Sequence, residues 1–301
     1  MKVIVFGGAG FLGSHVADEL INRGHQTLIF DLVKSPYLKK GQKGIVGDIT
    51  DQAAVAKAVK GCDIVYNFAG IGDIEQAKIN PLDTVKNNIM GNCILLEASR
   101  KNKIKRFVLA STLYVYSKTG SFYRTSKQSS ELLIENYAEI YGLNYTILRY
   151  GSLYGPRAGK DNWIYKVLKQ VLLEKKITRN GDGDEIREYI HVYDAARLSV
   201  DILDNEYKNE QVIITGNQQI KIKDIMIMIK EMLDNKIKLE FLPVSYSEHY
   251  EITPYSFKPN LARRMQSSHY IDLGQGLLES MAEIYKDHFP HKKHNGFYVK
   301  P

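Results

Sequence analysis

A tyrosine and a lysine four positions apart, Tyr123 and Lys127, are the residues of this 301-residue chain best suited to acid–base chemistry. Helical neighbours at this spacing share one face, so the two side chains would point the same way. The chain holds 20 tyrosines, so some matches to this spacing arise by chance. Two further pairs have it: Tyr114/Lys118 and Tyr165/Lys169.

The surrounding sequence favours the first pair over the other two. Tyr123 opens a predicted helix that runs on through Ser129 to Ile140. Just before it, Ser111 and Thr112 end a predicted strand, which places their hydroxyls at the carboxyl edge of a sheet. The pair at 114 and 118 falls in a predicted loop, and the pair at 165 and 169 has no such strand before it.

Tyr123 would act as a base, and Lys127 would stabilise its deprotonated form. A tyrosine has an unperturbed pKa of about 10, so working near neutral pH needs roughly 4 kcal/mol of differential stabilisation. A lysine cation one turn away favours the phenolate. Thr112, or alternatively Ser111, would exchange hydrogen bonds with the reacting hydroxyl of a substrate.

A glycine-rich loop near the N-terminus predicts where a cofactor binds. Gly7, Gly10 and Gly13 follow an apolar strand at 2–6 and precede a helical stretch. Their spacing is typical of a dinucleotide loop, in which glycines permit a tight turn and a close approach to pyrophosphate. The helix start then offers free N–H groups to the phosphates.

Asp31 ends the second apolar run, and it predicts the type of dinucleotide. A carboxylate there accepts hydrogen bonds from both ribose hydroxyls. The following residues, Leu32 and Val33, provide no cation for a 2′-phosphate. We therefore predict NAD rather than NADP.

These residues need a parallel sheet to bring them together, and the rest of the chain predicts one. Apolar runs alternate with helical patterns through the first half, which indicates a doubly wound α/β fold. The second half is mixed, with scattered short elements, as in a smaller substrate domain. The predicted strands lie at 44–49, 63–69, 106–110, 145–148, 188–191, 211–214 and 238–241, and the predicted helices at 51–59, 82–100, 129–140, 161–174, 193–203, 222–233 and 275–289. We predict a loop over 151–159.

Composition excludes several classes of protein. The net charge is +7, but the lysines are scattered, so we expect a solvated surface and no nucleic-acid partner. No apolar stretch reaches 18 residues and the start runs straight into a strand, so we expect neither a membrane span nor a signal peptide. Cys62 and Cys93 have no metal-ligand spacing, so we expect no metal site and a cytoplasmic location.

The whole pattern resembles an extended short-chain dehydrogenase/reductase of the NAD-dependent epimerase/dehydratase group, whose members modify nucleotide sugars. The resemblance covers nearly the whole length. It rests on the glycine loop 7–13, Gly47-Asp48-Ile49, Asn88 to Asn92, Ser111-Thr112 with Val115-Tyr116, Tyr123/Lys127, Leu148-Arg149-Tyr150, Tyr154 to Arg157, Gly181 to Gly183, and Arg187 to Val192.

The resemblance implies a Rossmann-type doubly wound sheet at 1–158 and a mixed α/β substrate region at 159–301, with 192–217 returning to the sheet. It also implies a homodimer formed through the helices at about 82–100 and 123–140. The implied NAD contacts are Gly7, Gly10, Phe11, Leu12, Gly13, Asp31, Asp48, Ile49, Phe68, Ala69, Gly70, Asn88, Tyr123, Lys127 and Tyr150. The implied substrate contacts are Thr112, Ser152 and Arg187, the last gripping the nucleotide diphosphate.

The leading functional prediction is an NAD-dependent nucleotide-sugar 4-epimerase in cell-surface polysaccharide or nucleotide-sugar biosynthesis. Alternatives are a keto-sugar reductase or dehydrogenase, a 4,6-dehydratase, or a non-enzymatic NAD-binding protein. The dehydratases of the family carry Asp-Glu after the catalytic threonine, where this chain has Leu113-Tyr114. The stretch from Thr112 to Tyr123 is shorter than in most extended members, where it borders the sugar. The resemblance therefore does not predict which sugar is bound.

Overall fold

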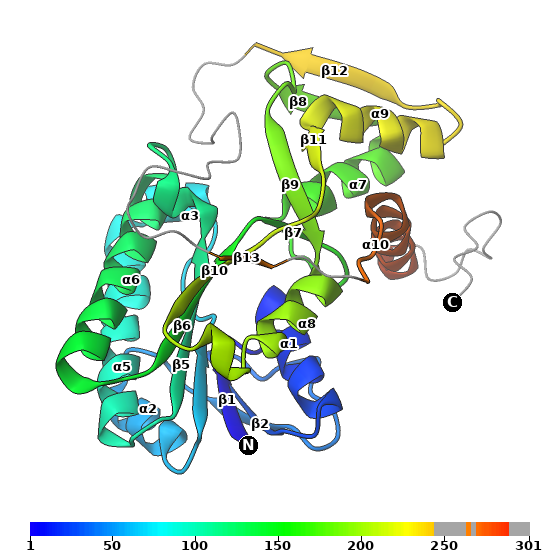
Figure 1. Ribbon diagram of the computed structural model, residues 1–301. Helices are drawn as coiled ribbons and strands as arrows, with labels where there is room; N and C mark the ends of the chain where they lie inside the picture. Colours follow the sequence, from blue (N-terminus) through cyan, green and yellow to red (C-terminus); the bar gives the residue numbers. More distant parts are fainter. Residues whose placement is uncertain (244–262, 266–268, 289–301) are drawn as a thin grey trace.

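The core of the molecule is an eight-stranded, wholly parallel sheet (Figure 1). The computed structural model describes residues 1–243, 263–265 and 269–288. In spatial order the strands are β13 (Arg263–Met265), β10 (Glu210–Ile214), β6 (Tyr145–Tyr150), β5 (Arg106–Thr112), β4 (Ile64–Asn67), β1 (Lys2–Phe6), β2 (Gln26–Asp31) and β3 (Lys43–Val46). This arrangement confirms the predicted doubly wound fold.

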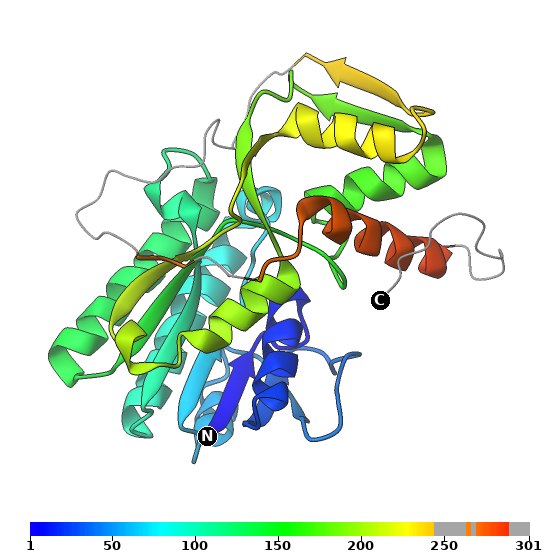
Figure 2. The ribbon, with the colours of Figure 1, turned by 45° about the vertical axis from the view of Figure 1, so that its right-hand side comes forward.

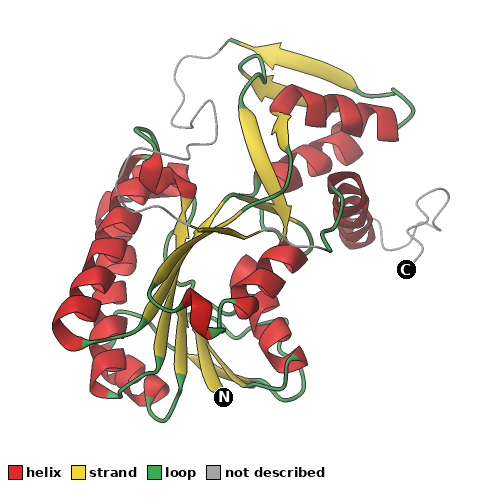
Figure 3. Cartoon of the chain, in the orientation of Figure 1, coloured by secondary structure: helices red, strands yellow, loops and turns green. Residues whose placement is uncertain are grey.

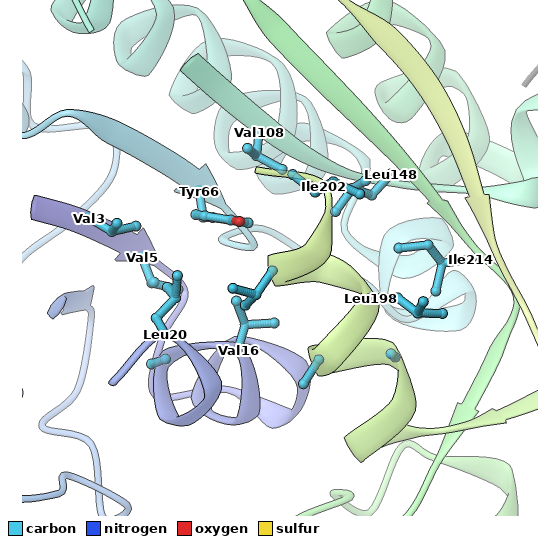
Figure 4. Close-up of a cluster of buried hydrophobic side chains, with 14 of the residues drawn as sticks. Val3, Val5, Val16, Leu20, Tyr66, Val108, Leu148, Leu198, Ile202 and Ile214 are labelled. Atoms are coloured by element: carbon cyan, nitrogen blue, oxygen red, sulfur yellow. The ribbon is translucent and has the colours of Figure 1, made fainter. Parts of the chain in front are cut away.

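Helices cover both faces of the sheet, which explains why the central strands are continuous apolar runs. Figure 4 shows one face, where Val16 and Leu20 of α1 and Leu198 of α8 pack against strand residues such as Val5 and Val108. The opposite face is covered by α2, α5 and α6. The helices are α1 (Phe11–Asn22) and α8 (Val192–Asp201) on the first face, and α2 (Gln52–Val59), α5 (Gly91–Lys101) and α6 (Ser121–Tyr141) on the second.

A smaller region stands beyond the carboxyl ends of the sheet strands (Figure 2). It has its own apolar core, which includes Leu168, Ile177, Ile225 and Leu277. Figure 3 shows its helices packed against two small sheets. One sheet has the order β11 (Gln219–Lys221), β9 (Ile186–His191) and β7 (Ser152–Tyr154), the other pairs β12 (Lys238–Leu242) with β8 (Lys176–Asn180), and the helices are α7 (Trp163–Glu174), α9 (Ile222–Met232) and α10 (Leu273–His288).

Short elements connect these layers. The helix expected over 82–100 consists of α4, the π-helical segment η1 and α5. The connecting elements are α3 (Ile74–Ile79), α4 (Pro81–Thr84), η1 (Val85–Met90), and the 3-10 turns η2 (Leu113–Tyr116) and η3 (Asn205–Tyr207).

The structure differs from the predicted elements in several places, and strands β11 and β13 are among the elements that were not predicted. Part of the loop expected over 151–159 is strand β7, because Ser152 to Tyr154 pair with β9. Neither α3 nor β8 was predicted. Strand β10 returns to the central sheet, where it pairs with β6, and β13 later joins the same sheet beside β10. The division at 158 and 159 stays a prediction.

Candidate active site

A large cleft opens at the carboxyl edge of the sheet, where it meets the smaller region. It has a cavity volume of about 750 Å³, which is within the range of small-molecule sites. Its walls come from four stretches of chain far apart in sequence: 7–13, 68–76, 110–127 and 150–162. The predicted catalytic residues Ser111, Thr112, Tyr123 and Lys127 all line it.

Helix α6 positions the tyrosine and the lysine on one face. Gly120 has a φ of +102°, and the helix begins directly after it. The Lys127 Nζ lies 5.9 Å from the centre of the Tyr123 ring and donates a hydrogen bond of 2.8 Å to the Ala110 carbonyl. This anchors the lysine at the end of β5, beside the cleft.

Lys127 is buried, and burial lowers its pKa to about 8, while the nearby Glu131 carboxylate raises it. Desolvation disfavours the charged ammonium, which explains the direction. A cation in so dry a position acts on Tyr123 with little screening.

The two candidate hydroxyls at the end of β5 have different partners. The Ser111 hydroxyl donates to the Glu131 carboxylate. The Thr112 Oγ1 accepts a 3.3 Å bond from the Tyr114 backbone N–H, which leaves its own proton available. This difference favours Thr112 as the hydroxyl that contacts a substrate, and sequence alone could not separate the two.

The glycine loop is shaped for a dinucleotide. Gly7 has a φ of +76°, and a Cβ there would lie 2.6 Å from the Phe68 and Ala69 backbone. A Cβ on Gly13 would lie 2.3 Å from the Gly7 carbonyl oxygen. Helix α1 starts without a side-chain cap, so its first N–H groups remain free to bind phosphate oxygens.

A second hollow of about 290 Å³ continues from this loop between β2 and the end of β4. Asp31 lines it, and its Oδ2 accepts a 2.9 Å bond from the Ala9 N–H, which fixes the carboxylate. Ile49, Phe68, Ala69 and Gly70 line the same hollow. The loop, the helix start and this hollow therefore fit an NAD molecule lying across the carboxyl edge of the sheet.

Most of the remaining predicted contacts also line one of the two hollows. Gly7, Gly10 and Phe68 line both. The others on the larger cleft are Phe11, Leu12, Tyr150 and Ser152. The Tyr150 hydroxyl bonds to the Ser199 hydroxyl at 2.6 Å, and burial raises its pKa, so this residue presents its ring to the cleft.

Three predicted residues do not line either hollow: Asp48, Asn88 and Arg187. Asp48 accepts two 2.8 Å bonds from Thr50, which lower the pKa of its carboxyl group. Asn88 is buried and bridges the Ile71 backbone to Ser126. It therefore supports the cleft wall from behind.

Arg187 is buried in β9, and its Nη1 donates to the Ile186 carbonyl at 2.9 Å. Its role at the diphosphate stays a prediction.

Arg157 lines the cleft and was predicted only as part of a motif. Its guanidinium donates to Asp18 of α1 at 2.8 Å and lies over the Tyr37 ring at 4.5 Å. Its backbone N–H donates to both carboxylate oxygens of Glu283 in α10. Arg157 thus connects the dinucleotide region to the smaller region, and the motif at 154–157 was the sequence signal for it.

No group of three or more metal-ligating side chains occurs among the described residues. Within the same residues, no helix is both long and apolar enough to cross a membrane.

Comparison with known proteins adds the family. An uncharacterized UDP-glucose epimerase from Bacillus subtilis is 28% identical, with 94% of this chain and 98% of that protein covered. A UDP-N-acetyl-alpha-D-glucosaminuronate decarboxylase from Bacillus cytotoxicus is 27% identical, with 93% and 96% covered. A crystal structure of UDP-glucuronic acid 4-epimerase from Bacillus cereus, in complex with UDP-glucuronic acid and NAD, is 26% identical with a TM-score of 0.81, covering 95% of this chain and 99% of that one.

The model of the NAD dependent epimerase/dehydratase family matches residues 3–215, which include the glycine loop, Thr112, Tyr123 and Lys127. This confirms the predicted resemblance and the dependence on NAD. The chain belongs to the NAD dependent epimerase/dehydratase family.

Proposed function

We propose that this protein is an NAD-dependent nucleotide-sugar 4-epimerase that acts through a transient 4-keto sugar. The observation that carries the proposal is the convergence of Thr112, Tyr123 and Lys127 on one cleft, next to a loop shaped for NAD. The similarity to proteins named as UDP-sugar epimerases supports the same activity.

In the proposed reaction, the Tyr123 phenolate takes the proton of the sugar C4 hydroxyl. Lys127 stabilises the phenolate by its charge, and Thr112 bonds the same sugar oxygen and holds it in place. When bound, NAD would accept the hydride from C4 and would supply it again to the opposite face of the keto carbon. Tyr123 returns the proton once the keto sugar has turned in the cleft, so the products have the opposite configuration at C4.

A dehydratase would need an acid–base pair to expel the C6 hydroxyl. Leu113, at the first of the two positions involved, is fully buried. Tyr114, at the second, lines the cleft and packs edge-on against Tyr123, with ring centres 6.2 Å apart. Neither side chain is a carboxylic acid, and this favours the epimerase over the dehydratase.

The substrate is a nucleoside-diphosphate sugar, and a UDP-sugar is the class that the relatives' names support. Arg187 holds the diphosphate and Ser152 contacts the sugar in this proposal. Replacing Arg187 with alanine would then raise KM more than it lowers kcat.

The enzyme acts as a homodimer in the cytoplasm. Exposed apolar side chains on two neighbouring helical segments support the dimer: Leu82, Val85 and Met90 on α4 and η1, and Phe122 and Leu132 on α6. Cys62 and Cys93 form no disulfide, which suits a reducing compartment.

The test is turnover with a trace of cofactor. UDP-glucose, UDP-N-acetylglucosamine and UDP-glucuronate are each incubated with NAD⁺ at a small fraction of the sugar concentration. An epimerase converts the sugar to an equilibrium mixture, because the cofactor is regenerated in every cycle. Product formation that stops at the amount of NAD⁺ supplied would identify a dehydrogenase instead.

A further inference from the structure

A buried ion pair lies behind the catalytic helix. The Arg149 guanidinium of β6 donates from Nε and Nη2 to the two carboxylate oxygens of Glu131 in α6, at 3.0 and 2.6 Å. The side chains are only 5% and 8% exposed. Burying such a pair often contributes no more to stability than well-packed apolar side chains would. Stability alone therefore gives little reason for the pair.

Arg149, Glu131 and their partner Ser111 all lie close in sequence to residues of the cleft. Ser111, which donates to Glu131, directly precedes Thr112. Glu131 follows Lys127 by one helical turn, and Arg149 directly precedes Tyr150. The pair therefore joins α6 to the ends of β5 and β6, where the cleft begins.

Arg149 also reaches the segment between the catalytic threonine and the catalytic tyrosine. It bonds the Tyr116 hydroxyl, and its guanidinium lies 4.8 Å from the centre of the Tyr116 ring. Tyr116 ends the 3-10 turn that follows Thr112. One guanidinium thus connects this short turn to the carboxylate on the catalytic helix.

We propose that Glu131 and Arg149 are positioning residues, which hold Tyr123 and Lys127 in register with Thr112 and keep the Ser111 hydroxyl away from the substrate. The inference rests on the proposed function, because it concerns the same catalytic set. Neither side chain contacts a substrate in this account. The pair acts through the placement of α6 against β5.

The test separates positioning from stability. The single variant Glu131→Leu leaves the buried Arg149 charge without this carboxylate, so its Tm falls. The neutral pair Glu131→Leu/Arg149→Met removes both charges, so its Tm recovers toward that of the wild type. If the pair positions α6, kcat in the neutral pair stays at least about tenfold below wild type while KM changes by less than about threefold.

These rates are compared on the fastest of the three UDP-sugars named above. A kcat that recovers together with Tm would show that the pair is only structural, and would overturn the proposal. The control is the pair Glu97 and Arg100 of α5, which has the same two-bond geometry at 2.9 and 2.6 Å but is about one-third exposed. Glu97→Gln/Arg100→Gln should leave kcat unchanged.

A second readout needs no sugar. The phenolate absorbance of Tyr123, with NAD⁺ present, is isolated by subtracting the spectrum of the matching Tyr123→Phe variant. Among the described residues, Lys127 and Tyr114 lie against the Tyr123 ring. Because Glu131 also raises the pKa of Lys127 by its charge, the neutral pair is compared with Glu131→Gln/Arg149→Gln, which removes the same two charges but keeps side chains that can bond each other and Ser111. A titration at higher pH in the neutral pair than in this variant reports a loosened contact between Lys127 and Tyr123. Equal titrations in the two variants would contradict the proposal.

The outcomes also separate this inference from the proposed function. If Tyr123→Phe keeps full activity, the catalytic assignment itself is wrong. If Tyr123→Phe is inactive and the neutral pair is fully active, only the positioning role fails.

Discussion

In the proposed mechanism the Tyr123 hydroxyl ionises near neutral pH, helped by the buried Lys127 cation, and the Thr112 hydroxyl lines the same cleft. We predict that Tyr123→Phe lowers kcat by at least about a hundredfold, because general-base groups typically contribute 10²–10⁴. The ring remains, so the fold and NAD binding should be unchanged. Steady-state kinetics together with NAD⁺ titration of the variant would measure both.

The other two tyrosines with the same spacing serve as controls. Tyr165→Phe changes a side chain of α7 that packs against the core of the smaller region. Tyr114→Phe keeps the ring that packs against Tyr123. Both variants should stay active. If Tyr114→Phe is inactive and Tyr123→Phe is active, the catalytic base is Tyr114 in the preceding turn and not Tyr123 in α6.

The lowered pKa of Lys127, about 8, predicts the alkaline side of the pH profile. The ammonium is present below this pKa and is lost as the pH rises through it. Since the cation favours the phenolate, kcat should decline above about pH 8 rather than near the ordinary lysine pKa of about 10.4. A pH–rate profile measures this, and a flat rate up to pH 10 would contradict it.

The sequence predicts which side chains form the candidate site, but it does not predict their hydrogen-bond partners. Ser111 and Thr112 are adjacent hydroxyls on one strand end, and the bond from Ser111 to the Glu131 carboxylate is what takes Ser111 away from a substrate. Glu131 belongs to a different element, so no local pattern predicts that contact. Arg187 has the same limitation, because its place in the sequence does not say which atoms its guanidinium meets.

Among the elements, the turn from β1 into α1 depends most closely on single residue types. We predict that Gly13→Ala weakens NAD binding strongly, because its Cβ would collide with the Gly7 carbonyl and push apart the loop. Gly44→Ala, in β3, is the matched control, since its Cβ would meet only Leu38 at an ordinary 3.6 Å. Isothermal titration with NAD⁺ compares the two variants, and equal affinities would refute the packing argument.

The central strands could be predicted because each is a buried apolar run. Strands such as β1 and β4 are continuous apolar runs covered on both faces. Strand β8 is mostly polar, with only Ile177 fully buried, and it exists because β12 pairs with it 62 residues later. Helix α3 has six residues, too few for a helical period to stand out.

For the whole molecule, the exposed apolar side chains of α4, η1 and α6 predict self-association. Met90 and Leu132 are 55% and 58% exposed. We expect the double variant Met90→Asp/Leu132→Asp to sediment as a monomer at concentrations where the wild type is a dimer, because charges in an apolar interface are desolvated. Leu173→Asp, equally exposed on α7, should leave the dimer intact. Identical sedimentation of all three proteins would show that Met90 and Leu132 do not lie in a dimer interface.

The cleft is also a property of the whole molecule, and this limits what the sequence could predict about the sugar. Its walls combine the glycine loop, the end of β5, the start of α6 and the segment before α7. Each stretch was recognisable by itself. Their relative placement depends on contacts such as Arg157 with Asp18 and Glu283, which join segments more than 100 residues apart.

The central claim is that hydride leaves and returns to C4 within one closed cycle. The direct measurement uses a UDP-sugar deuterated at C4, with NAD⁺ far below the sugar concentration. The account predicts a product of inverted C4 configuration that retains its deuterium, with no accumulation of NADH. Stoichiometric NADH, or a 4-keto-6-deoxy product formed by loss of water, would contradict it in favour of a dehydrogenase or a dehydratase.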